Sequence, residues 1–384
     1  MGSLYLKSIS RASIDSAMSE MPEGSTTSSE PRRSMGYGVR VPKLRYLIRI
    51  SLRLFAALFG VGVVGYLVFR TGPGGVWKQV QAVGWGLVLI IILGGFGQFI
   101  KAWAWRQAFV CDISALSWAR SFGVQLVSDA AGQLGLAGKL VGEGLRVSLV
   151  GSVVPLSRRI SAAAIDAGMH TLTAAFVTVL GIVATLLLAN LSGRWRVDAL
   201  LLAALLMAVV ALAAVAVASR WPLIGNAARA LARVPLLQNW VSAKQPIIDS
   251  AEHNLLTFYR EAPAAFWANL TLNFLGHALA VLEVYLILLL MGAHVAVVSA
   301  LALEGLTKVI NLVGVFNPGN LGTYEGGNML IARFLGVPAT AGLALALCRR
   351  ARIFFWSGVG AMCMIAIKRP NGHSTSQSDA ASAP

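Results

Sequence analysis

Residues 317–327 read Asn-Pro-Gly-Asn-Leu-Gly-Thr-Tyr-Glu-Gly-Gly and separate two strongly apolar segments, 286–315 and 336–367. A soluble protein would place such a run in a surface loop. Lipid cannot satisfy free backbone N–H and C=O groups, so irregular backbone at membrane depth must be buried in protein or line a cavity. In transporters, such breaks form substrate sites. The sequence therefore nominates four candidate translocation residues: Pro318, Gly319, Gly322 and the ionisable Glu325.

The composition places most of the chain in lipid. Only 12% of the residues are charged, about half the share of an average soluble domain. Uncharged runs such as 79–100, 171–190 and 199–218 are long enough to cross a bilayer as helices. We predict an all-α, polytopic integral membrane protein with about seven or eight transmembrane helices.

The charge is strongly basic, at +16 from 32 basic and 16 acidic residues. Seven basic residues and no acid lie in 32–53, and more follow in the loop 219–261. This distribution flanks apolar runs, so it favours anionic lipid head groups over nucleic acid as the partner. Basic flanks lie in the cytoplasm, which predicts a membrane protein whose N-terminus and loop 219–261 are cytoplasmic.

These patterns divide the chain into three parts. Residues 1–44 are basic and rich in serine, and residues 368–384 are polar, so we expect two disordered tails. Residues 45–367 form the transmembrane domain.

Two stretches interrupt the apolar pattern, one in each half of the domain. They are 113–157, which holds several charged residues and glycines, and 316–327. Paired interruptions indicate a transporter built from two related halves, with broken or re-entrant helices. The alternative is that either stretch is an ordinary polar loop.

Glu304, Lys308 and Asn311 fall at i, i+4 and i+7 and share one helix face. An unpaired charge in a membrane is costly, so the first two are expected to pair. The pair either ties helices together or belongs to a polar stripe that faces a hydrated cavity.

Two further pairs occur at helical spacing. Glu143 and Arg146 are three residues apart, and Arg146 either caps an interfacial helix or binds a lipid phosphate. Asp166 and His170 are four apart, which is expected to give a buried hydrogen-bonded pair or a proton-coupling site.

Polar residues also mark the last segments. Asn273 and His277 share a face, while their spacing directs Glu283 elsewhere. Three arginines precede the uncharged run 353–367, and they either extend to head groups at one interface or recognise an anionic lipid. They are Arg349, Arg350 and Arg352.

No motif for catalysis or metal binding is evident. The sequence has no GxxxxGKS or GxSxG pattern, and its three cysteines and five histidines lack metal-ligand spacing. We expect no enzyme activity, no cofactor and no metal.

Three motifs resemble the flippase-like transmembrane region of lysylphosphatidylglycerol synthases. They are Gly142-Glu143-x-x-Arg146, the polar helix from Glu304, and Pro318-Gly319-x-Leu321-Gly322-x-x-Glu325-Gly326-Gly327. Within that superfamily the chain is most similar to membrane proteins associated with hopanoid biosynthesis. Ala104-Trp105-Arg106 and Arg350-Ala351-Arg352 contribute to that similarity.

The resemblance implies a domain that moves lipids between leaflets, and no segment resembling the synthase domain is expected. Candidate substrates are a hopanoid or an anionic or aminoacylated phospholipid, and lipid-biosynthetic enzymes are candidate partners. A non-transporting scaffold for such enzymes is the alternative. A lipid-linked glycosyl- or aminoacyl-transfer enzyme ranks third.

Overall fold

A computed structural model describes most of the chain between residues 65 and 367. The described residues are 65–66, 68–69, 72–109, 114, 116–133, 136–151, 154–189, 193–219, 221, 223–233, 235–314, 317 and 320–367. Both predicted tails, most of a first span expected at 52–69, and the candidates Pro318 and Gly319 lie outside them. The described residues form α-helices and no strands, so the predicted all-α class is confirmed.

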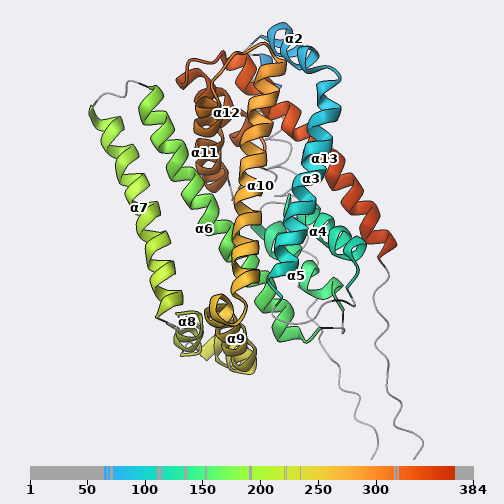
Figure 1. Ribbon diagram of the computed structural model, residues 1–384, viewed down its shortest axis with the longest axis vertical. Helices are drawn as coiled ribbons and strands as arrows, with labels where there is room; N and C mark the ends of the chain where they lie inside the picture. Colours follow the sequence, from blue (N-terminus) through green and yellow to red (C-terminus); the bar gives the residue numbers. More distant parts are fainter. Residues whose placement is uncertain are drawn as a thin grey trace, which may run out of the picture. The chain divides into compact units, whose positions relative to one another are not determined.

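Twelve helices are described, and Figure 1 shows their arrangement. Their bounds are α2 Pro73–Val83, α3 Gly86–Gln107, α4 Trp118–Gly132, α5 Leu136–Leu149, α6 Leu156–Leu188, α7 Gly193–Ala218, α8 Leu223–Leu231, α9 Pro235–Glu261, α10 Pro263–Leu290, α11 Val297–Val313, α12 Thr323–Phe334 and α13 Ala339–Ala366.

Four of these helices are long and apolar enough to cross a membrane: α3, α6, α7 and α10. Helix α13 also has the length, with 28 residues, but it carries three arginines. The chain is therefore built as a multi-pass membrane protein. The count of seven or eight spans stays a prediction.

Both predicted interruptions contain breaks between helices. The first holds α4 and α5, of 15 and 14 residues. In the second, α11 ends at Val313 and α12 begins at Thr323. At about 1.5 Å per residue, α4 and α5 reach only about two thirds of the thickness of a hydrocarbon core. Whether these short helices are re-entrant stays a prediction.

Two apolar clusters hold the helices together. One is built on α2, α3 and α10–α13 and includes Ile90, Val284 and Leu343. The other, with Trp105 and Ile165, joins α3–α6 to α9. Helices α3 and α10 contribute to both clusters. Along α3, Gln98 and Lys101 fall between the residues of the two clusters, and along α10 Asn273 and His277 do so.

Helix α6 crosses α11 at two glycines. A Cβ added to Gly181 would lie 2.6 Å from the Cα of Gly305, and one added to Gly305 would lie 2.7 Å from the Cα of Gly181. Real side chains do not approach so closely, so the crossing requires glycine on both helices. Close contact of small residues is how membrane helices pack without a hydrophobic driving force.

Helix α7 lies at the side of the bundle beside α6 (Figure 1). Its main contacts are with α6 and α9. Most of its apolar side chains are exposed, including Leu201, Leu205 and Leu212. Such a surface marks contact with lipid or with another protein, and α7 has the length and apolar composition of a membrane span.

Candidate functional site

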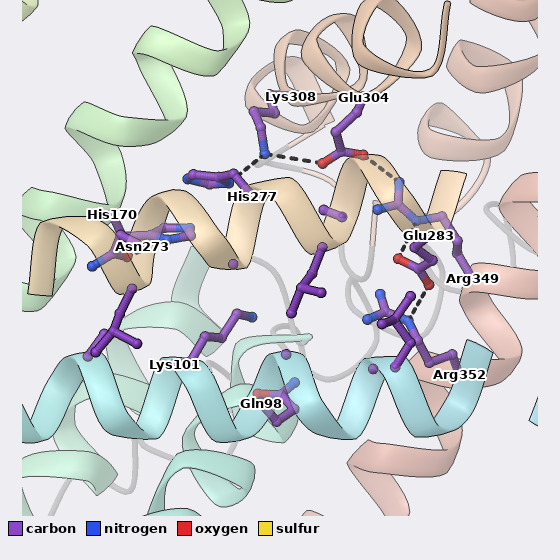
Figure 2. A pocket seen from close by; sticks show the side chains of 18 residues that line it. Gln98, Lys101, His170, Asn273, His277, Glu283, Glu304, Lys308, Arg349 and Arg352 are labelled. Atoms are coloured by element: carbon purple, nitrogen blue, oxygen red, sulfur yellow. Dashed lines mark hydrogen bonds and ion pairs between the residues drawn. The ribbon is translucent and has the colours of Figure 1, made fainter. Parts of the chain in front are cut away.

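Arg349 on α13 is the centre of a buried network of charges (Figure 2). Its Nη1 lies 2.8 Å from Oε2 of Glu304 on α11, and its Nε lies 3.2 Å from Oε2 of Glu283 on α10. Nη1 also donates to the hydroxyl of Tyr324 on α12, at 3.1 Å. All four side chains are buried. One guanidinium thus joins four helices.

Each of the two carboxylates holds a second cation. Glu283 Oε1 lies 2.8 Å from Nε of Arg352, and Glu304 Oε1 lies 3.1 Å from Nζ of Lys308. The same Nζ lies 3.1 Å from Nδ1 of His277. Figure 2 shows the resulting line of contacts from His277 to Arg352. With the central arginine, three cations face two carboxylates, which leaves a formal surplus of one positive charge.

Glu325 makes a separate, closed contact at the glycine-rich break. Its Oε2 accepts from the backbone N–H of Gly322 at 2.7 Å, and its Oε1 accepts from Nε of Arg350 at 2.6 Å. Arg350 Nη2 donates to the carbonyl of Asn320 at 2.9 Å. Gly322 has φ 80°, a conformation that favours glycine. Glu325 therefore caps α12 and attaches the break to α13.

Arg146 on α5 forms a buried ion pair in the first interruption, comparable to the Glu325–Arg350 pair in the second. Its Nη1 lies 2.8 Å from Oδ2 of Asp166 on α6, and its Nη2 donates to Oε1 of Gln125 on α4. Glu143 lies farther away, at 3.6 Å. The guanidinium stacks over the ring of Trp105, 4.7 Å from its centroid.

Two adjoining cavities lie among these charges, with volumes of about 600 and 210 Å³. They share seven lining residues, among them Lys101, Glu304 and Arg349. The larger cavity is also lined by several predicted residues, namely Glu143, Arg146, Asp166, Asn311, Arg350 and Arg352. Lys308 lines the smaller one. Glu325 and Gly322 line neither of these two cavities.

The expectation that the three arginines extend to head groups at an interface is wrong. Helix α13 begins at Ala339, so the arginines occupy its middle rather than its end. Arg349 and Arg350 are only 6% and 8% exposed. Carboxylates from α10, α11 and α12 compensate their charges there.

The predicted Asp166–His170 pair does not form. Asp166 binds Arg146 and accepts from Nδ2 of Asn269 at 3.3 Å. His170 Nδ1 lies 3.2 Å from Oδ1 of Asn273. Spacing along α6 placed the two side chains on one face, but other helices supply their partners.

Glu283 was expected to point away from Asn273 and His277, and this is wrong. All three line the smaller cavity. The cavity extends along α10 toward α13, where Arg349 and Arg352 reach the carboxylate of Glu283.

Sequence reasoning missed the polar residues of α3 and α4. Gln98 Nε2 donates to Oδ2 of Asp129 at 2.7 Å, and Lys101 Nζ lies 3.5 Å from Oδ1 of the same carboxylate. The signal that could have found them is Gln98 near the end of the uncharged run 79–100, followed three residues later by Lys101. Among the described residues, no group of three or more histidine, cysteine or acidic side chains is placed to hold a metal ion.

A family model described as the lysylphosphatidylglycerol synthase TM region matches residues 53–360. Comparisons with curated proteins and with solved structures found no match. The family match and the four apolar helices indicate a multi-pass membrane protein related to lipid metabolism.

Proposed function

We propose that this chain, which belongs to the lysylphosphatidylglycerol synthase TM-region family, is a lipid transporter that moves a lipid between leaflets. The observation that carries the proposal is a cavity of about 600 Å³ that is lined by charged side chains and lies in a chain with four apolar helices long enough to cross a membrane. Ionisable groups inside a membrane are costly and mark the paths of substrates. The role requires no catalytic residue and no cofactor.

The volume of the cavity fits a polar head group, while the lipid tail stays in the bilayer. Arg352 is the arginine best placed to contact that head group. Its Nε faces Glu283, and its two amino groups have no hydrogen-bond partner within the part of the chain that the structure describes. A guanidinium with free amino groups binds a phosphate through two parallel hydrogen bonds.

The cellular setting is part of the same proposal. We place the protein in a bacterial inner membrane with residues 219–261 in the cytoplasm, because basic loops stay on that side. The motifs at 104–106 and 350–352 support the branch associated with hopanoid biosynthesis.

The test is lipid movement in vesicles that contain the purified protein. Arg352→Gln removes a cation from the cavity, while Glu283 keeps Arg349 as a partner, so the fold should survive. We expect the rate of movement of a fluorescent phospholipid to fall about tenfold or more, the value of one charged hydrogen bond. Arg194→Gln is the matched control, because the Arg194 side chain is 93% exposed.

Wild-type protein that leaves lipids in place under all conditions would refute transport and favour the scaffold alternative. Wild-type movement with equal rates for Arg352→Gln and Arg194→Gln would remove Arg352 from the lipid path.

A further inference from the structure

His277 on α10 carries an unused hydrogen-bonding atom inside the smaller cavity. The side chain is 4% exposed, and its Nε2 has no hydrogen-bond partner among the described residues. Its Nδ1 lies 3.1 Å from Nζ of Lys308. Lys308 is ion-paired with Glu304, and an ammonium only donates, so Nδ1 accepts. The neutral ring then carries its proton on Nε2, which makes no hydrogen bond within the described part of the chain.

His170 on α6 presents the complementary atom. Its Nδ1 faces Oδ1 of Asn273, 3.2 Å away. Nδ2 of Asn273 donates to the backbone carbonyl of Asn269, which fixes Oδ1 as the acceptor. His170 Nδ1 therefore carries the proton, and its Nε2 is an acceptor. His170 is exposed and lines both cavities.

The two rings lie against each other, with centroids 4.8 Å apart and planes 31° apart. Figure 2 shows both beside the line of charges, at the end opposite Arg352. The two adjacent rings in the cavity wall thus offer one N–H donor and one nitrogen acceptor. A phosphate oxygen could use only the donor, and an ammonium only the acceptor. A hydroxyl donates and accepts at once, so it satisfies both.

We propose that His170 and His277 form a subsite for a hydroxyl group, so that the transported lipid has an alcohol in its head group. This inference rests on the proposed transport function. A site built around a hydroxyl rejects an analogue without it, because the buried donor is then left unpaired. The hydroxyl could belong to a phospholipid, whose phosphate would lie at the arginine end, or to a neutral polyol lipid.

The test is a pair of binding comparisons by calorimetry in a zwitterionic detergent. The first pair is dioctanoyl phosphatidylglycerol and dioctanoyl phosphatidylethanol, which share charge and tails but differ in head-group hydroxyls. The second pair is monodecanoylglycerol and ethyl decanoate, which carry no phosphate. We expect the wild type to prefer the hydroxylated member of at least one pair about tenfold, consistent with one hydrogen bond. The pair that shows the preference identifies the source of the hydroxyl.

His277→Phe and His170→Phe should each reduce the preference to about onefold without weakening the binding of the compound that lacks the hydroxyl. His277→Gln keeps an N–H donor, so it should keep part of the preference even if a phenylalanine variant folds poorly. His294→Phe is the control, because this exposed histidine lines neither cavity.

No preference in the wild type for either pair, or full preference in both phenylalanine variants, overturns the subsite. A preference that depends on the histidines in a protein that moves no lipid would refute transport and leave the subsite standing. Lipid movement without any preference for the hydroxylated compound would support transport and refute the subsite.

Discussion

The two interrupted regions use the same chemical pair with the partners exchanged. In the first, the arginine, Arg146, lies on the short helix α5 and the carboxylate, Asp166, lies on the long helix α6. In the second, the carboxylate, Glu325, lies on the short helix α12 and the arginine, Arg350, lies on the long helix α13. Both pairs are buried. Each attaches a broken segment to a continuous helix.

The pairs differ in what remains available to a ligand. Both oxygens of Glu325 are occupied by protein donors, and the residue lines neither cavity. Arg146 and Asp166 both line the larger cavity, and Nε of Arg146 has no hydrogen-bond partner among the described residues. The Glu325–Arg350 pair is therefore a closed clamp, whereas the Arg146–Asp166 pair borders the larger cavity, where the proposed head group would lie.

Glu325→Gln should have the largest effect on stability. It leaves Arg350 as an uncompensated buried charge, which costs on the order of 3 kcal/mol. Thermal or chemical unfolding in detergent measures the loss. The double variant Glu325→Gln with Arg350→Met should recover much of it, because both charges are then gone.

Asp249→Asn is the matched control for this clamp. It breaks a pair with Arg229 in which both side chains are about half exposed, and exposed pairs contribute less than about 1 kcal/mol. Equal losses for Glu325→Gln and Asp249→Asn would contradict the clamp.

Arg146→Met should cost less stability, about 2 kcal/mol, and should abolish lipid movement. Asp166 keeps the amide of Asn269 and borders the cavity, so its charge is partly compensated after the change. Unfolding and vesicle assays on the same preparation separate the two effects. Normal lipid movement in this variant would show that the Arg146–Asp166 pair, like the Glu325–Arg350 pair, has only a structural role.

Lys308→Met should have the smallest effect on stability, about 1 kcal/mol. Glu304 keeps Arg349 at 2.8 Å, so the change leaves no unpaired carboxylate. Unfolding in detergent, measured together with Glu325→Gln and Arg146→Met, tests this order of stability losses. A loss as large as that of Glu325→Gln would mean that Arg349 does not compensate Glu304.

The helices were predictable from the sequence because apolar length determines them. The uncharged run 199–218 lies within α7, Gly193–Ala218, and the apolar segment 336–367 contains α13, Ala339–Ala366. The pairing of charges was less predictable. Spacing identified Glu304 with Lys308, which the structure confirms at 3.1 Å. It could not identify Arg349 as the second partner of Glu304, 45 residues away, because such contacts depend on how α11 and α13 pack.

The glycine crossing of α6 and α11 limits how the protein can move. With Gly181 and Gly305 in backbone contact, the two helices cannot slide past each other without a clash. Asp166 and His170 on one helix, and Glu304 and Lys308 on the other, therefore travel as one rigid frame. In the proposed transport, any change that opens the cavity must therefore take place away from this crossing.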